Sequence, residues 1–545
     1  MTITGTWSGT LTLQKSFVDE FSSFSDVTTY TSNTSVAVTD SADNTAIWYK
    51  IGFKDGDYTS GSAVVNLEFG VGGGSGGVTL GAQQVSTGGR YGLCRVVAYT
   101  SSTQVSVDTF DDFSSDVPST IWWRGQWNEQ DSWPSSLDLH EGRLFHSGKN
   151  ELVGSVSDAY SSFALDVTGD SGPIQRSIGY GPVVITNGLV SGNRLLVMTE
   201  GSEAQVKSSS FDEPLTPTNF SIKDISTFGS ARIPPVKVDD KAYFAHRSGL
   251  RLMEIAFSAE KQDYNTRDLN FLHPDMNLEN PITKVVVQRM PDTRFHCVRS
   301  DGTVAVLLYE PASEVAAWVR VETSGEVEDA YVLPGTVEDT VYYVVKRAIN
   351  GATVRYHEKW ALENECIGGS TSKLMDCSYT YSGVSTALIT GLTHLEGESV
   401  IVWGNGKYLG AYTVSTGSIT LYESVTSCTV GLAYTAEFKS ARLAYGAQMG
   451  TALAQQKRIH SLGLLMENTH YQGLLWADNF DTMYNLPLVE NGTETAENYI
   501  WSNYDERSFP LDGQWNTDSR LCLKAQAPYP VTVLAAVIGM ETNDK

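Results

Sequence analysis

Alternating apolar and polar positions recur along the middle of the chain as paired arms joined by glycine-containing turns. Two clear cases are HCVRSDGTVAVLLYE, around Asp301-Gly302, and VYYVVKRAINGATVRYHEKW, around Asn350-Gly351. Asp-Gly and Asn-Gly allow positive φ at both central residues, which is the geometry of tight hairpin turns. Because side chains alternate between the two faces of a strand, the pattern predicts a β-hairpin at each place.

These turns return at a nearly constant spacing. NRLLVMTEGSEAQVKSSS turns at Glu200-Gly201 and KAYFAHRSGLRLMEIAF turns at Ser248-Gly249, so the four turn glycines, at 201, 249, 302 and 351, stand 48, 53 and 49 residues apart. LHEGRLFHSG, with Glu141-Gly142, extends the series upstream. A period of roughly 40 to 50 residues is typical of β-propellers with four strands per unit. An ordinary run of hairpins in a sandwich is the alternative interpretation of the same spacing.

The pattern predicts a mainly β protein with a β-propeller-like core interrupted by β-sandwich domains and very little helix. We expect an N-terminal β domain over residues 1–125, rich in Ser, Thr, Gly and Asp, and propeller-like repeats over 126–365. A small inserted β-sandwich is expected over 376–440, and a C-terminal β segment that closes the propeller over 441–545.

Two local predictions concern the C-terminal segment. MGTALAQQKRIHSLG consists largely of good helix formers and ends at Gly463, which predicts a short helix. The last apolar run, PVTVLAAVIG, predicts a buried strand that completes a sheet begun far upstream.

Composition narrows the classes of protein that the chain can belong to. At 545 residues the chain is too long for one hydrophobic core, and its formal charge of -25 disfavours general attraction to nucleic-acid phosphates or anionic lipid. No apolar run is long enough to span a bilayer, and the start lacks the pattern of a secretory signal, so we expect a protein made and folded in a cytoplasm. The six cysteines lie far apart and form no C-x-x-C pair, which predicts neither a zinc site nor a disulfide framework.

Motifs for nucleotide or hydrolytic chemistry are weak or absent in the sequence. GVGGGSGG contains the spacing G-x-G-x-x-G at Gly72, Gly74 and Gly77, but no helical pattern follows it, so a loop is the better interpretation. No G-x-x-x-x-G-K-[ST], H-E-x-x-H or G-x-S-x-G occurs. We therefore predict no cofactor, no catalytic residue and no enzymatic activity.

One pair of histidines and two pairs of aspartates are candidate metal ligands in the sequence, and each has a simpler interpretation. The nearest histidine pair flanks a predicted turn and lacks a third ligand, and two pairs of aspartates could offer oxygen ligands to Ca²⁺ without forming a complete calcium loop. We predict hydrogen-bonded (satisfied) or surface histidines and solvated turn aspartates, and no metal site, at His140, His146, Asp55, Asp57, Asp166 and Asp170.

Tryptophans crowd into the segment IWWRGQWNEQDSWPS, at positions 122, 123, 127 and 133. Clustered tryptophans can form a platform for carbohydrate, but at a domain boundary they more often pack a seam between domains. We interpret them as packing. Exposed aromatic residues elsewhere, such as Trp403 or Trp476, are candidates for stacking on sugars.

Several segments, in order along nearly the whole chain, resemble the tail nozzle proteins of short-tailed bacteriophages, also called tail tubular protein B. The matching segments include GTWSGTLTLQKS, WRGQWNEQDSWPSSLDLHEGRLFHSG, LTPTNFSIKDISTFGSARIPPVKVDDKAYFAHRSGLRLMEIAFSAEKQDYNTRDLN, VRSDGTVAVLLYE, YVVKRAINGATVRYHEKW, TGLTHLEGESVIVWGNGKYLGAYTVSTGSITL and APYPVTVLAAV. The order of these segments along the chain supports the resemblance as much as their amino-acid sequences do. Longer members of the family carry an additional region before the segment matching GTWSGT, which begins here at Gly5.

The resemblance implies a structural virion protein of the phage tail, built as a β-propeller interrupted by β domains and made in the host cytoplasm. It implies a homohexamer whose ring continues the DNA channel below the tail adaptor ring, docks other tail proteins and presents surfaces to tail fibres. Double-stranded DNA would be retained until host contact and would then pass without sequence-specific binding. An acidic chain suits a repulsive bore, since six copies carry a formal charge of about -150 before screening.

The alternative hypotheses are carbohydrate-directed. A tail-associated polysaccharide depolymerase or propeller glycosidase would need two carboxylates at a fixed separation, which 63 acidic residues can neither establish nor exclude from sequence. A carbohydrate-binding propeller protein would need only exposed aromatic residues. Propellers support both enzymes and scaffolds, so the fold does not choose between these functions.

Overall fold

The computed structural model describes residues 1–16, 24–36, 48–66, 93–111, 127, 133–163, 167–178, 185–208, 213–277, 279–444, 452–487, 489–490, 492–502 and 505–543. These residues are mainly β, as predicted, and their helices are five single 3-10 turns: η1 Pro274–Asn277, η2 Pro311–Ser313, η3 Glu363–Glu365, η4 Thr393–Leu395 and η5 Ala452–Ala454. The chain forms two compact units, Met1–Val117 and Pro118–Lys545. None of the helices among the described residues is long and apolar enough to cross a membrane.

The first unit is built around one long strand. Strand β1 pairs antiparallel with three others, and a separate hairpin follows; the strands are β1 Thr2–Ser16, β2 Ser25–Tyr30, β3 Thr34–Ser35, β4 Trp48–Asn66, β5 Leu93–Ser101 and β6 Gln104–Asp111. β1 and β4 pair over most of their length, and Leu11 and Leu13 are buried.

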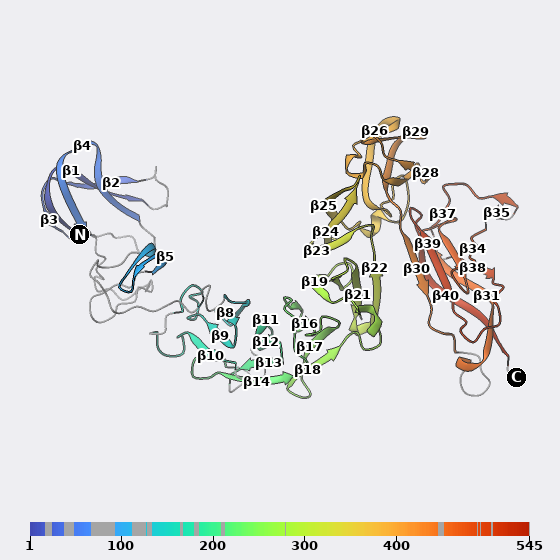
Figure 1. The fold of residues 1–545 in the computed structure, drawn as a ribbon, viewed down its shortest axis with the longest axis horizontal. Coiled ribbons are helices and arrows are strands. Elements are labelled where there is room, and N and C mark those ends of the chain that lie inside the picture. The colour runs from blue at the N-terminus through green and yellow to red at the C-terminus, as the bar shows by residue number, and fades with distance from the viewer. Residues whose placement is uncertain are drawn as a thin grey trace. The chain divides into compact units, whose positions relative to one another are not determined.

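The second unit begins with five antiparallel sheets that follow one another in chain order (Figure 1). We call these five sheets the array. The first comprises β7 Ser136–His140, β8 Arg143–Gly148, β9 Glu151–Gly154 and β10 Ile174–Ser177, and the second comprises β11 Thr186–Ser191, β12 Leu195–Thr199, β13 Glu203–Lys207 and β14 Ser221–Ser226. The third comprises β15 Val236–Val238, β16 Lys241–Ala245, β17 Leu252–Ser258 and β18 Asp263–Asp268; the fourth, β19 Ile282–Gln288, β20 Arg294–Arg299, β21 Val304–Glu310 and β22 Val315–Val321; and the fifth, β23 Glu326–Leu333, β24 Thr340–Ile349 and β25 Ala352–Lys359.

The turn prediction is confirmed at all four repeated glycines, each of which lies between the second and third strands of its sheet. Asn350 and Gly351 both have positive φ, at 49° and 76°, as a tight Asn-Gly hairpin requires. At Asp301-Gly302 only the glycine does, so the prediction of two positive φ angles there is wrong. A Cβ on Gly302 would lie 2.6 Å from the Cβ of Glu326, so the close approach of the fifth sheet also requires glycine there.

The series begins in a different hairpin from the one expected. Glu141-Gly142 joins the first and second strands of its sheet, whereas the four repeated turns join the second and third. The equivalent turn in the first sheet lies at Lys149-Asn150, where Lys149 has a φ of 50°. The repeat therefore extends to the first sheet without a glycine to mark it.

Successive sheets of the array are held together by apolar side chains that alternate along each strand. In the second sheet, Leu195 and Val197 pack toward the first sheet, while Leu196 and Met198 pack toward the third. The third sheet does the same, with Phe244 in the junction to the second sheet and Tyr243 in the junction to the fourth. The inner sheets are thus buried on both faces, which explains their nearly continuous apolar sequences.

After the array the chain forms a small β module with its own core. Its sheet has the order β26-β29-β27-β28, with β26 Asp376–Thr390, β27 Ser399–Gly404, β28 Lys407–Thr413 and β29 Ser418–Leu432. Asn405-Gly406 forms the tight turn between β27 and β28, and both residues have positive φ.

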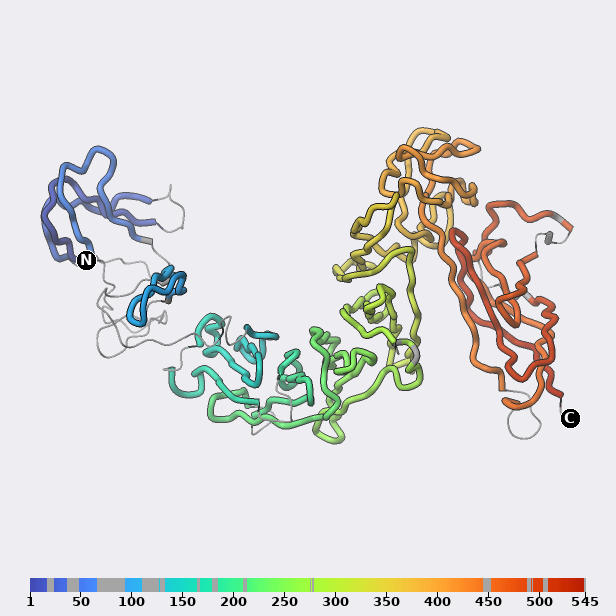
Figure 2. The backbone as a smooth tube through the Cα atoms, in the orientation of Figure 1, coloured from blue at the N-terminus to red at the C-terminus, as the bar shows by residue number. Residues whose placement is uncertain are grey.

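The C-terminal strands pair among themselves around another core (Figure 2, orange to red). One sheet has the order β30-β39-β33-β34 and another the order β38-β31-β40; the strands are β30 Thr435–Lys439, β31 Gln456–Glu467, β33 Leu474–Ala477, β34 Tyr484–Asn485, β38 Asp505–Pro510, β39 Cys522–Gln526 and β40 Thr532–Asn543. Two further pairs are β32 Thr469–His470 with β37 Ile500–Trp501 and β35 Val489–Glu490 with β36 Thr493–Glu494. Among the described residues, none of these strands joins a sheet of the array, so closure of the propeller by residues 441–545 stays a prediction.

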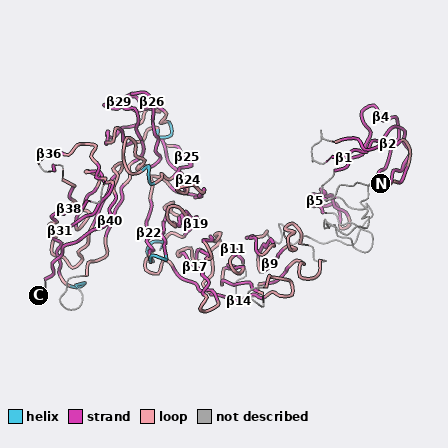
Figure 3. Tube along the Cα trace, turned by 180° about the vertical axis from the view of Figure 1, so that it is seen from behind, coloured by secondary structure: helices cyan, strands magenta, loops and turns pink. Residues whose placement is uncertain are grey.

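The helix predicted near residue 456 is wrong. Residues 452–454 form η5, and the following residues form strand β31, seen as a long magenta segment in Figure 3. Gly463, expected to end a helix, lies in mid-strand between Ser508 and Val537. Pairing with two neighbouring strands decides this segment against its intrinsic helix propensity.

The final strand is not buried as predicted. Among the described residues β40 pairs with β31 alone, at the edge of its sheet, and most of its side chains are exposed. None of its side chains is fully buried on either face, so the continuous apolar run did not indicate burial here.

The junction between the third and fourth sheets provides a test of the packing. Phe295 is fully buried, and its ring lies 4.4 Å from that of Tyr243 and 6.4 Å from that of Tyr309, centroid to centroid. We expect Phe295→Ala to lower the free energy of unfolding by about 3–5 kcal/mol, because it leaves a cavity between two sheets. Urea unfolding measures the change.

The matched control is Val384→Ala on β26, whose side chain is 85% exposed. It should change the free energy of unfolding by less than about 0.5 kcal/mol. Equal effects of the two substitutions would contradict the junction packing described above.

Candidate functional site

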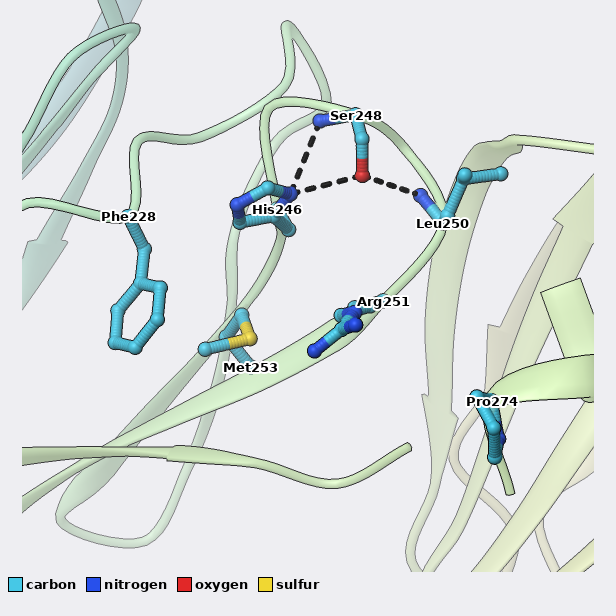
Figure 4. Close-up of a pocket in the computed structure, with 7 residues that line it drawn as sticks. All are labelled: Phe228, His246, Ser248, Leu250, Arg251, Met253 and Pro274. Carbon is cyan, nitrogen blue, oxygen red and sulfur yellow. Dashed lines mark hydrogen bonds between the residues drawn. The ribbon is translucent and has the colours of Figure 1, made fainter. Parts of the chain in front are cut away.

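A cavity of about 380 Å³ opens beside the turn of the third sheet. Figure 4 shows its walls: Phe228 comes from the segment after the second sheet, Met253 from β17, and Pro274 from η1, with Leu250 on the turn. His246, Ser248 and Arg251 are the polar lining residues. The volume lies at the small end of the range for ligand pockets, about 300–1,000 Å³.

The turn from His246 to Arg251 is held by its own hydrogen bonds. The backbone N–H of Leu250 donates to Ser248 Oγ at 3.2 Å, and the Ser248 hydroxyl lies 2.8 Å from His246 Nδ1. The backbone N–H of Ser248 also donates to Nδ1, at 3.2 Å. Nδ1 is therefore an acceptor, which places the proton of the neutral ring on Nε2.

Charge in the cavity is limited. Burial lowers the pKa of His246, and the nearby guanidinium groups of Arg247 and Arg251 lower it further, so the imidazole is neutral at pH 7. Arg251 donates to Asp268 at 2.5 Å. The seven described lining residues include no carboxylate, so the cavity lacks the pair of acids that glycoside hydrolysis uses. The cavity can accept a small, partly apolar ligand group. The guanidinium of Arg251, which is paired with Asp268, lies at its edge.

A buried carboxylate links the third and fourth sheets. Glu254 Oε2 accepts hydrogen bonds from Tyr243 at 3.0 Å and Tyr309 at 2.8 Å, and Lys241 Nζ lies 3.2 Å away. Burial, and then the negative charge of Glu254, raises the pKa of Tyr243. Both phenols therefore remain protonated donors, and the cluster is a satisfied structural network.

A second buried carboxylate lies close to the cavity wall. Glu203 is fully buried and accepts a short hydrogen bond from Ser226, which in turn accepts one from Thr266 of the third sheet at 3.1 Å. Burial raises the pKa of Glu203 to about 7, against the opposing effects of Ser226 and the backbone N–H groups of Phe228 and Gly229. Glu203 is therefore the described carboxyl group best placed to change its charge near neutral pH.

Other potential nucleophiles are not activated. All six cysteines are free thiols, and burial raises the pKa of Cys297 to about 12 and that of Cys428 to about 11. His296 is fully buried, with Nδ1 2.7 Å from the hydroxyl of Tyr343, and burial lowers its pKa to about 3. Burial thus keeps Cys297, Cys428 and His296 uncharged at pH 7. Cys297 packs in the junction of the third and fourth sheets, and Cys428 packs in the core of the β module.

Of the histidine pair, His140 is satisfied as predicted, but the buried Nδ1 of His146 has no hydrogen-bond partner among the described residues, so the prediction is wrong there. His140 is buried, with Nδ1 3.0 Å from Ser191 Oγ, and His146 contacts the rings of Trp127 and Phe163.

The prediction that the candidate aspartates are turn residues is wrong for Asp55 and Asp57. Asp55 and Asp57 lie within β4, whereas the backbone oxygen of Asp170 accepts a hydrogen bond from Arg143 at 2.6 Å. Searching the parts of the chain that the structure describes finds no group of three metal-ligating side chains. Asp166, the glycine run Gly72, Gly74 and Gly77, and Trp122 and Trp123 lie outside the described residues.

The aromatic candidates for sugar stacking are wrong. Trp403 is fully buried and donates its indole N–H to the backbone oxygen of Gly369 at 3.0 Å, and Trp476 is only 4% exposed. Tertiary packing covers both rings. Trp133, expected to pack at a seam, is instead 62% exposed.

The sequence-based search missed Glu203 and Glu254. A signal was present for Glu254, which interrupts the apolar run LMEIAF, whereas Glu203 begins the mixed segment EAQVK and gave none. A carboxylate inside an apolar strand requires a partner. Its partners come from other strands and sheets, so the sequence could not name them.

No protein-family profile matches the chain, and no curated protein matches it. Among solved structures, the GH32 β-fructofuranosidase BmSUC1 of Bombyx mori aligns over 75% of this chain and 91% of its own, at 8% identity and a TM-score of 0.19. A glycoside hydrolase aligns over 74% of this chain and 96% of its own, at 11% identity and a TM-score of 0.18. TM-scores this low carry no argument about shared architecture or catalytic residues.

The comparison corrects one prediction from the sequence. We predicted that the chain is not an enzyme. The structural neighbours reported above are glycoside hydrolases, although their structural similarity to this chain is weak. The absence of enzymatic activity is therefore withdrawn as a conclusion.

The protonation of Glu203 gives a testable pH dependence. A carboxyl group whose pKa rises from 4.5 to about 7 on folding binds its proton more tightly in the folded state. Its stabilisation is fully present below pH 4.5 and is lost as the pH rises through 7, a change of about 3 kcal/mol. Glu203→Gln should remove this part of the pH dependence of the free energy of unfolding.

Urea unfolding between pH 4.5 and pH 8 measures the slope for wild type and variant. Glu260→Gln, at an exposed position in the turn between β17 and β18, is the control and should keep the wild-type slope. A Glu203→Gln variant with the wild-type slope would contradict the assignment.

Proposed function

We propose that this chain is a ring-forming structural protein of the tail nozzle type found in short-tailed bacteriophages. The observation that carries the proposal is the ordered resemblance of segments from Gly5 to Val537. The repeated sheets of the array agree with the propeller that the resemblance implies. In this role, six copies surround a channel, dock the adaptor ring and other tail proteins, and let DNA pass when the host is contacted.

Physical features of the chain support this role. A conduit must keep its shape under load, and the array offers four successive apolar junctions between sheets. The formal charge of -25 per chain would repel DNA phosphates along a bore, which favours sliding over binding.

Electron microscopy of the full chain, alone and mixed with extracts that contain the other tail proteins, tests the proposal. We expect six-fold rings with a central hole wide enough for duplex DNA. Compact monomers or trimers in both samples would overturn it.

A carbohydrate-directed function is the second candidate, as a depolymerase, a glycosidase or a sugar-binding protein. The observation in its favour is the exposure of two indole rings, Trp133 at 62% and Trp515 at 43%. Exposed tryptophans provide flat apolar surfaces on which sugar rings stack.

Incubation of the chain with host surface polysaccharide, followed by measurement of reducing ends and of glycan binding, tests this candidate. It predicts sugar release or binding that Trp515→Ala weakens about tenfold or more, with Trp403→Phe as a control for a buried ring. If the chain neither releases sugar nor binds glycan, the carbohydrate-directed candidate is ruled out and the ring proposal still stands.

A further inference from the structure

The walls of the cavity beside the turn of the third sheet are joined to one another by backbone hydrogen bonds. The N–H of Arg247 in the turn donates to the backbone oxygen of Gly229 at 2.9 Å, next to Phe228 on the preceding connection. The N–H of Ile282, at the start of β19, donates to the backbone oxygen of Gly249 at 2.8 Å. The segments before and after the third sheet therefore both fix the position of the turn. A cavity formed in advance loses little conformational freedom when a ligand binds.

Two side chains on the cavity wall keep hydrogen-bond donors that have no protein partner among the described residues. His246 uses Nδ1 as an acceptor, so its proton is on Nε2, and Figure 4 shows this second nitrogen on the side of Phe228, away from Ser248. Arg251 donates one bond, from Nη1 to Asp268 at 2.5 Å. Its Nε and Nη2 share the other edge of the guanidinium and donate to none of the described residues.

The charge around these donors is positive. Three charged groups act on the imidazole of His246: the guanidinium groups of Arg247 and Arg251 and the carboxylate of Asp268. Two positive charges and one negative charge leave a local formal charge of +1, although the whole chain carries -25. The complementary ligand group is therefore an anion that accepts hydrogen bonds.

The rest of the wall is apolar and consists of Phe228, Leu250, Met253 and Pro274. The ring of Phe228 stands edge-on to that of His246, with 6.3 Å between the centroids and 71° between the planes. An inorganic anion would leave these apolar side chains without contacts in the cavity of about 380 Å³. A purely apolar molecule would leave the two donors unpaired, which costs binding free energy. A ligand that satisfies the whole wall must combine an anionic end with an apolar body.

We propose that this cavity binds a small organic carboxylate whose body is compact and apolar. The carboxylate accepts hydrogen bonds from Nε2 of His246 and from the Nε and Nη2 edge of Arg251. The body packs among Phe228, Leu250 and Met253. Arginine pairs with a carboxylate through two parallel N–H groups, which fixes the orientation of the ligand as well as its charge.

This site goes beyond the proposed function and does not rest on ring formation. A ligand in the cavity contacts three segments: the connection before the third sheet, the turn within it, and η1 after it. Because the ligand binds the folded arrangement of these segments, it stabilises the array in proportion to its occupancy. Success or failure of the binding test therefore leaves the proposal of a tail ring unchanged.

Three probes of similar size and different charge test the chemistry: benzoate, its neutral amide benzamide, and the cation benzylammonium. Ligand-observed NMR titration of the full chain at pH 7 and low salt gives a dissociation constant for each probe. We expect benzoate to bind with a dissociation constant of about 1 mM or lower, as suits so small a ligand. Benzamide should bind about tenfold more weakly, and benzylammonium should not bind.

Two variants at Leu250 differ in charge and hardly in size. Leu250→Asp places a carboxylate on the cavity wall, and Leu250→Asn places a neutral amide there. Leu250→Asp should bind benzoate about tenfold more weakly than Leu250→Asn, and should bind benzylammonium more tightly.

Arg251→Met removes the paired donors and keeps the apolar stem of the side chain. It should weaken benzoate binding about tenfold and benzamide binding less. Arg355→Met on β25 is the matched control, since Arg355 is also exposed and paired with one carboxylate, that of Glu328. The control should bind benzoate as wild type does.

Three results would overturn the inference. The first is wild type that does not bind benzoate at concentrations up to about 10 mM. The second is benzoate that binds no more tightly than benzamide or benzylammonium. The third is equal benzoate affinity of Leu250→Asp and Leu250→Asn when both keep the wild-type circular dichroism spectrum, because the ligand would then lie elsewhere.

Discussion

The array depends on the burial of both faces of its inner sheets. A strand turns alternate side chains to opposite sides, so each inner sheet packs on two neighbours at once, as Leu196 and Val197 do in β12. Each fully buried aliphatic side chain contributes about 1.5–3 kcal/mol. The same constraint favours a repeat along the chain, because each unit must supply one apolar face to each of its two neighbouring sheets and then turn back.

Two-sided burial also governs the polar groups. A glutamate in such a strand has no route to water, so Glu254 is satisfied by two tyrosines and a lysine, and Glu203 retains a proton up to about pH 7. The cavity beside His246 lies where a turn and a short 3-10 helix meet instead of two sheets. The candidate binding cavity therefore lies at the margin of a junction, whereas the buried network around Glu254 inside a junction is structural.

Sequence reasoning succeeded where local chemistry decides the backbone and failed where partners decide it. Asn350-Gly351 needs only its own preference for positive φ, and the hairpin was predicted correctly. Residues 456–463 carry helix formers, yet pairing with β38 and β40 makes them a strand. Trp403 and Trp476 gave no sign of burial, because the residues that cover them are distant in the sequence. The candidate cavity was missed for the same reason: Phe228, His246 and Pro274 share no motif.

By itself the sequence determined the mainly β class, the repeat near fifty residues and the positions of the hairpin turns, because alternation and turn preference are local properties of the chain. It also fixed the acidic net charge, which follows from composition alone. Only the tertiary structure decided which face of each strand meets which sheet and which carboxylates are buried. Those outcomes depend on contacts between residues far apart in the chain, and no local pattern encodes them.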